Sequence, residues 1–136
     1  MKTIVVGYDG TEPAKRALER AAELASAFGS RLVVTSVVEV VMSAAGRSIG
    51  TAPEGEGTHA AQLAAAKAFL AEKGLEADYI EALGHPAESI VDAAVERGAD
   101  MIVIGTREPG FVQRLIGNSV SNAVANKAHC DVLIVH

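Results

Sequence analysis

The segment ADMIVIGT at residues 99–106 carries the clearest sign of how this chain of 136 residues folds. Residues 100–104 are almost continuously apolar and end at Gly105, without the polar alternation of a half-exposed strand. Such a run is typical of a strand buried on both faces of a parallel sheet. Similar runs predict four further strands, at residues 3–8, 32–38, 77–83 and 132–135.

Helical patterns lie between these strands. They follow Thr11 as far as Gly29, cover residues 58–73, start again at Pro86, and return over residues 118–127. This alternation predicts an α/β fold in a single domain, 1–136: a three-layer, doubly wound, Rossmann-like domain with a five-stranded parallel sheet of order 3-2-1-4-5. Ligands of such sheets bind beyond the carboxyl ends of the strands, where the winding reverses. The loops that follow the first and fourth strands are therefore the place to look for a site.

Residues 39–57 differ in character from the rest, because glycine, serine and proline are scattered through them. We expect a long and mobile connection without regular structure there. Its apolar residues could cover a ligand, but a plain connection is the interpretation we favour.

Composition narrows the class of protein. The chain is 49% hydrophobic and 21% charged, with a net charge of −5, which is typical of a globular protein and disfavours a broad contact with nucleic acid or an anionic membrane. A signal peptide and an apolar run of about 20 residues are not apparent, and the single cysteine, Cys130, cannot form an internal disulfide. We expect a cytoplasmic protein. The four histidines have no metal-ligand spacing, so we expect no metal site in the protein itself.

The loop after the fourth strand combines three features that suit a phosphate group. Glycines at positions 105, 110 and 117 allow a close backbone approach, and a helix begins near Asn118-Ser119, where free amides and the helix dipole favour an anion. Arg107 and Arg114 can add charge-assisted hydrogen bonds. An ordinary surface loop, with glycines at its turns and Ser119 as a helix cap, explains the same residues about as well.

Five segments, distributed over nearly the full length, form a specific set: IVVGYDGT at 4–11, GHPAESI at 84–90, ADMIVIGTR at 99–107, GNSVS at 117–121 and CDVLIV at 130–135. In these segments the chain as a whole resembles the universal stress proteins. The resemblance implies the doubly wound fold and, in the nucleotide-binding branch of the family, an adenine nucleotide such as ATP or AMP, whose phosphates could bind Mg²⁺.

The resemblance also implies site residues. Asp9 would lie near the base or ribose, Val37 would offer backbone contacts to adenine, and the ribose and phosphates would be surrounded by Gly105, Gly117, Asn118 and Ser119. The full predicted nucleotide-binding set adds Tyr8, Thr106, Arg107, Gly110 and Val120. For Asp9, a helix-capping role is an equally good interpretation.

The loop departs from the family pattern at three positions. Glu108 stands where the second glycine of the family signature falls, Pro109 lacks an amide donor, and Asn118 is an added residue after Gly117. These changes weaken the case for ATP more than the case for an adenine nucleotide. Two alternatives therefore stay open: a universal stress protein without ATP that acts as a dimeric interaction module, and a cyclic-AMP binder.

A homodimer is also expected. Family members commonly pair through the last strand, and here Val132, Leu133, Ile134 and Val135 would otherwise form a bare apolar edge. The sequence offers no identifiable general base, so catalysis beyond slow ATP hydrolysis is not expected.

Overall fold

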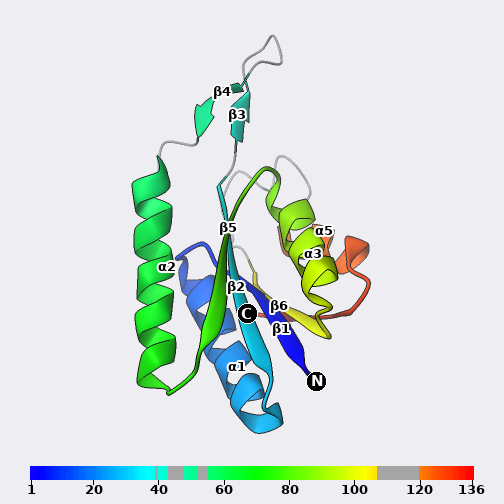
Figure 1. Ribbon diagram of the computed structural model, residues 1–136. Coiled ribbons are helices and arrows are strands. Elements are labelled where there is room, and N and C mark those ends of the chain that lie inside the picture. Colours follow the sequence, from blue (N-terminus) through cyan, green and yellow to red (C-terminus); the bar gives the residue numbers. More distant parts are fainter. Residues whose placement is uncertain (39, 43–47, 52–54, 107–119) are drawn as a thin grey trace.

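The computed structural model describes residues 1–38, 40–42, 48–51, 55–106 and 120–136. Strands and helices alternate along the chain (Figure 1). In chain order they are β1 (Thr3–Gly7), α1 (Glu12–Phe28), β2 (Arg31–Val38), β3 (Val40–Met42), β4 (Ser48–Thr51), α2 (Gly55–Glu72), β5 (Ala77–Leu83), α3 (Pro86–Arg97), β6 (Met101–Gly105), α5 (Val120–Lys127) and β7 (Asp131–Val135).

The main sheet has five parallel strands in the order β5-β2-β1-β6-β7. Numbered along this sheet alone, the order is 3-2-1-4-5, so the predicted doubly wound α/β fold is confirmed. Helices α1 and α2 pack on one face of the sheet, and α3 and α5 pack on the other (Figure 1). The direction of winding changes between β1 and β6, which pair side by side at the centre.

The core lies in two clusters, one on each face of the sheet. Because side chains alternate along a strand, Ile4 and Val6 join the cluster under α1 and α2, while Val5 joins the one under α3. All three are fully buried, which explains why the strands read as continuous apolar runs. None of the described helices is long and apolar enough to cross a bilayer.

The expectation of an unstructured connection over residues 39–57 was wrong for the described part of it. Short strands β3 and β4 pair antiparallel, with Val40 opposite Thr51, and α2 begins at Gly55 rather than at Thr58. Strands of three and four residues are too short to give a periodic signal. A glycine inside a helix costs only about 1 kcal/mol, so Gly55 and Gly57 do not stop the alanine-rich helix.

The carboxylate of Asp100 links β6 to β1 at the amino ends of these two strands. Asp100 Oδ2 accepts hydrogen bonds from the amides of Lys2 (2.6 Å) and Thr3 (3.0 Å), and the amide of Asp100 donates to the Thr3 carbonyl (2.9 Å). The amide of Thr3, followed by that of Lys2, holds the pKa of Asp100 below its ordinary value. The ionised carboxylate therefore stabilises the start of β1.

We expect Asp100→Ala to lower the melting temperature at pH 7 by a few degrees, because the two amides lose their charged acceptor. The pKa of Asp100 is lower in the folded state, so its contribution to stability is present above the unfolded pKa of about 3.9 and is lost as the pH falls through the folded value. Melting curves from pH 3 to 7 should show the difference from wild type closing in acid. Asp92→Ala, at an exposed carboxylate of α3, is the control, and an Asp100 difference that persists at pH 3 would contradict this assignment.

Candidate functional site

A cleft opens at the carboxyl ends of β1, β2 and β6, where the winding of the sheet reverses. Its volume is about 100 Å³. It is lined by Gly7, Tyr8, Asp9, Thr11, Ala14, Thr35, Val37, Pro86, Ile90, Ile104, Gly105, Thr106 and Val120. A wider hollow of about 500 Å³ lies between α2 and the start of β5, but it is far from the switch point at which ligands of this fold bind.

The cleft gathers every predicted site residue that the structure describes. Six of them line it, namely Tyr8, Asp9, Val37, Gly105, Thr106 and Val120. The other five, Arg107, Gly110, Gly117, Asn118 and Ser119, lie outside the described residues, as do Glu108 and Pro109. Residues from β1, β2, β6 and α5 are thus brought together although they are more than 100 positions apart in sequence.

The floor of the cleft is formed by the side chains that face α3. Gly7 of β1 lies in register with Thr35 of β2. A Cβ atom added to Gly7 would stand 2.9 Å from Cδ1 of Ile90 and 3.5 Å from Cδ1 of Ile104. Because Gly7 has no side chain, the ends of the Ile90 and Ile104 side chains can lie next to its backbone at the floor of the cleft.

Thr35 is the polar group of this floor. The residue is 1% exposed, and its hydroxyl has no hydrogen-bond partner among the residues that the structure describes. Its backbone is satisfied, since the Thr35 carbonyl accepts from the amide of Tyr8 at 2.9 Å. A buried hydroxyl without a partner is uncommon in proteins.

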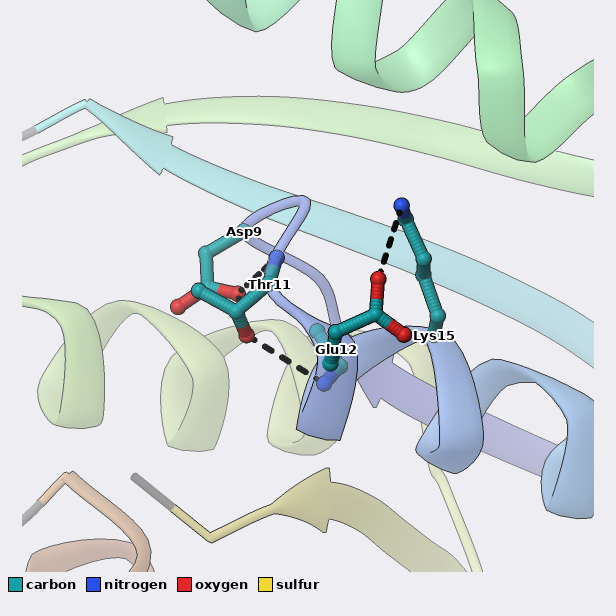
Figure 2. A network of polar contacts seen from close by, with 5 residues as sticks. Asp9, Thr11, Glu12 and Lys15 are labelled. Atoms are coloured by element: carbon teal, nitrogen blue, oxygen red, sulfur yellow. Dashed lines mark hydrogen bonds and ion pairs between the residues drawn. The ribbon is translucent and has the colours of Figure 1, made fainter. Parts of the chain in front are cut away.

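At the mouth of the cleft, Asp9 supports the start of α1 (Figure 2). Asp9 Oδ1 accepts from the amide (3.0 Å) and the hydroxyl (2.6 Å) of Thr11, and Thr11 Oγ1 in turn accepts from the amide of Ala14 at 3.3 Å. Thr11 is thus the N-cap, with Pro13 in the first turn. Both contacts of Asp9 use the same oxygen, and its side chain is exposed, so capping and ligand contact are compatible.

Charge around the start of α1 is mixed but leans acidic. Glu12 pairs with Lys15 at 3.4 Å on the exposed side of the helix (Figure 2). Tyr8 packs into the cluster under α1 and α2, and burial raises the pKa of its hydroxyl, an effect that Lys15 partly opposes. Tyr8 is therefore neutral at physiological pH, and among the described residues that line the cleft Asp9 is the one with an acidic or basic side chain.

Gly105 has a packing role that the sequence did not predict. A Cβ atom at this position would stand 2.4 Å from the backbone C and O atoms of Pro13 and 2.9 Å from the amide nitrogen of Ala14. The absence of a side chain lets β6 meet the first turn of α1, and this contact closes one side of the cleft.

Asp100 precedes β6 at its amino end, opposite the cleft, so it cannot form a carboxylate pair with Asp9. Among the described residues, no group of three or more His, Cys, Asp or Glu side chains could hold a metal ion.

Sequence reasoning missed part of the cleft. Gly7, Thr35, Pro86, Ile90 and Ile104 were not predicted as site residues, yet all five line it. One signal was available: Thr35 is a polar residue in an apolar strand, two positions before Val37, and alternation places both side chains on the same face.

The comparisons of this chain with known proteins all point to the same family. The chain matches the Universal stress protein family over residues 1–136. A universal stress protein of Thermus aquaticus is 37% identical over 134 residues, which cover 98% of each chain. A universal stress protein solved in complex with cAMP is 27% identical, with a TM-score of 0.77 over 99% of this chain and 96% of its own. One from Archaeoglobus fulgidus in complex with dAMP is 26% identical, with a TM-score of 0.75 over 100% and 98%.

Proposed function

The chain belongs to the universal stress protein family, and from this premise we propose that it binds an adenine nucleotide in the cleft beyond β1, β2 and β6. In this proposal it is a stress-response or regulatory protein that senses or stores the nucleotide rather than turning it over efficiently. The observation that carries the proposal is the position and make-up of the cleft. It lies at the switch point of the sheet and has an apolar floor with a polar mouth.

The lining suits a flat heterocyclic base. Val37, Ile90 and Ile104 offer an apolar surface, and the polar groups of Asp9, Thr11 and Thr106 are at hand around it. Ligand sites commonly combine such a surface with a few placed polar groups. The complexes of two relatives with cAMP and dAMP support an adenine base as the occupant, because both share the fold over nearly their whole length.

The charge distribution favours one orientation of the nucleotide. Asp9 and Glu12 would repel phosphates at the start of α1, and the first-turn amide of Ala14 is already taken by the Thr11 cap. The start of α5 at Val120 carries no acidic residue in its first turn, and Val120 also lines the cleft. We therefore place the phosphates toward α5, where the predicted residues Gly117, Asn118 and Ser119 precede the helix.

The number of phosphates is the part of the proposal that the loop chemistry affects most. Glu108 and Pro109 in place of a glycine-rich turn disfavour a triphosphate, so AMP-like ligands should bind at least as well as ATP. If Mg²⁺ accompanies ATP, the phosphates would supply most of its ligands. Cyclic AMP is the second candidate, and the relative solved with that ligand favours it.

The direct test is to denature the purified protein and analyse the released small molecules by mass spectrometry. We expect an adenine nucleotide in the released fraction, or a clear thermal shift of ligand-free protein with AMP, cAMP or ATP. Competition titrations then rank the three ligands. No released nucleotide together with no shift for any of them would reject the proposal in favour of a dimeric interaction module.

Asp9 should contribute to affinity beyond its support of the helix cap. We expect Asp9→Ala to weaken AMP binding by about tenfold, the loss of one charge-assisted hydrogen bond, measured by isothermal titration calorimetry. Thr11→Ala is the matched control, because it removes the hydroxyl that donates to Asp9 and caps Ala14 but leaves the carboxylate in place. Both variants should lose about 1 kcal/mol of stability. Equal affinities for the two variants would show that Asp9 acts only on the helix.

The homodimer belongs to the same proposal. Strand β7 is an edge of the sheet, and Val132 to Val135 are half-buried in the single chain. An apolar edge strand of this kind is a template for pairing with a second copy.

A cytoplasmic location is also part of the proposal. Cys130 is partly buried, and burial raises the pKa of its thiol. It is therefore a packing residue suited to a reducing compartment.

Light scattering should give twice the chain mass for the wild type. We expect Ile134→Lys to shift the protein to monomer, because two-fold pairing of β7 would bring two like charges close together. Leu83→Lys is the control, since Leu83 is 67% exposed at the end of the opposite edge strand, β5. A wild type that is monomeric at all concentrations would rule out the dimer.

A further inference from the structure

We propose that the Thr35 hydroxyl is a specificity-determining contact for the base of the bound nucleotide. The inference rests on the proposed function, but it assigns a residue that neither the sequence motifs nor the family resemblance indicated. It starts from a hydroxyl that is buried, unpartnered and directed at the floor of the cleft.

The direction of the side chain follows from the strand. Val33 belongs to the cluster under α3, and Val37 packs against that cluster. Thr35 lies between them in the alternation, so it faces the same way, toward the cleft rather than toward α1 and α2. The next residue, Ser36, is also fully buried but faces the opposite cluster.

The unpartnered hydroxyl destabilises the empty protein. Burying a hydroxyl without a partner is unfavourable, and valine has nearly the same shape and a higher preference for strands. Nothing in the packing of β2 therefore requires threonine here. The Thr35 hydroxyl lacks a partner in the ligand-free protein and gains one in the complex. The free energy of the new hydrogen bond therefore contributes fully to binding.

The cleft offers room for more than a single water beside Thr35. A buried water needs a cavity of only roughly 10–15 Å³, whereas the cleft measures about 100 Å³. Gly7, Ile90 and Ile104, which line the cleft together with Thr35, have no polar side-chain atoms. The space suits a larger group that is mainly apolar and carries a polar atom at its edge.

A heterocyclic base is such a group, and the rest of the nucleotide is not. Phosphates and ribose hydroxyls would have to give up water beside isoleucine side chains, which is costly. Ring nitrogens and an exocyclic amine meet the hydroxyl as acceptor or donor, since a hydroxyl can play both parts. Because Oγ1 is itself buried, neighbouring side chains must shift for a ligand atom to reach it.

The first experiment needs no ligand. Thr35→Val should raise the melting temperature of the nucleotide-free protein by about 2–5 °C, because an unpaired polar group is removed. Ser36→Ala is the matched control at the adjacent buried hydroxyl, and it should not raise the melting temperature. A fall of several degrees in Thr35→Val would overturn the inference, because it would mean that the protein itself satisfies the hydroxyl.

The second experiment measures affinity for AMP by calorimetry. Thr35→Val should bind about tenfold more weakly, whereas Thr35→Ser, which keeps the hydroxyl, and Ser36→Ala should stay within about threefold of wild type. A more stable protein with weaker binding is a combination that a purely structural role does not produce. Unchanged affinity in Thr35→Val overturns the inference while leaving the proposed function intact. Failure of the wild type to bind AMP rejects the proposed function instead.

The third experiment locates the contact on the ligand. Purine riboside monophosphate and the 1-, 3- and 7-deaza analogues of AMP each lack one polar atom of the base. For one of them, the loss caused by Thr35→Val should disappear, while for 2′-deoxy- and 3′-deoxy-AMP it should remain about tenfold. If the loss disappears only with a deoxy sugar, the hydroxyl binds ribose and the assignment to the base is wrong.

Discussion

Gly105→Ala should destabilise the fold by about 3 kcal/mol or more, which is a large part of the 5–15 kcal/mol typical of a domain. The added Cβ would lie 2.4 Å from the backbone of Pro13 and 2.9 Å from the Ala14 amide nitrogen. Backbone atoms cannot move aside as a side-chain end can, so β6 and α1 must separate. Urea denaturation followed by circular dichroism measures the loss, and nucleotide binding should fall with it because this contact closes the cleft.

Gly98→Ala is the control for this substitution. Gly98 has a φ of 60° and caps α3, but a Cβ there meets nothing within 4 Å. Its replacement should cost only the strain of the left-handed conformation, about 1–2 kcal/mol. If Gly105→Ala proves no worse than Gly98→Ala, then the close approach of β6 to α1 is not a determinant of stability.

The fold could be predicted from the sequence because strands that are buried on both faces are apolar at nearly every position. Val5, Val33 and Ile102 face one cluster while their neighbours face the other, so each strand reads as an uninterrupted apolar run. Such runs, alternating with helices, leave few topologies to choose from. Strands β3 and β4 were not predicted, because neither is long enough to establish a period.

The site was accessible only in part. Asp9, Val37, Gly105, Thr106 and Val120 were found because they follow strands or begin a helix, which are positions that a linear pattern marks. A second role of Gly105 was not predicted, however. The sequence suggests a glycine that admits a ligand, and the structure shows that it also lets α1 come close to β6. Which element lies against a glycine is decided by the packing of the fold and cannot be predicted from the local sequence pattern.

The position of Thr35 beside Gly7 could not be predicted without the register between strands. The sequence marks Thr35 only as a polar residue in an apolar strand, and the pairing of β1 with β2 places it next to Gly7 on the floor of the cleft. Ile90 and Ile104 complete that floor from α3 and β6. A polar residue opposite a glycine becomes informative once both are known to face the same cavity.

Gly7→Val should abolish nucleotide binding while leaving the protein folded. The new side chain would meet Cδ1 of Ile90 at 2.9 Å and Cδ1 of Ile104 at 3.5 Å, both of which are flexible side-chain ends. They can yield into the cleft of about 100 Å³, so overpacking should cost only about 1–2 kcal/mol, partly offset by the strand preference of valine. Affinity for AMP should fall by at least about 100-fold, roughly 2.7 kcal/mol, by calorimetry.

Gly7→Ala provides the graded comparison, because a single methyl displaces Ile90 less than a valine does. Binding should weaken in the order wild type, alanine, valine, while the unfolding midpoint in urea changes little. The pattern is opposite to that of Gly105→Ala, in which stability is lost first and binding only as a consequence. Retention of AMP affinity by a folded Gly7→Val protein would place the ligand away from Gly7 and Thr35, and the cleft described here would then not be the nucleotide site.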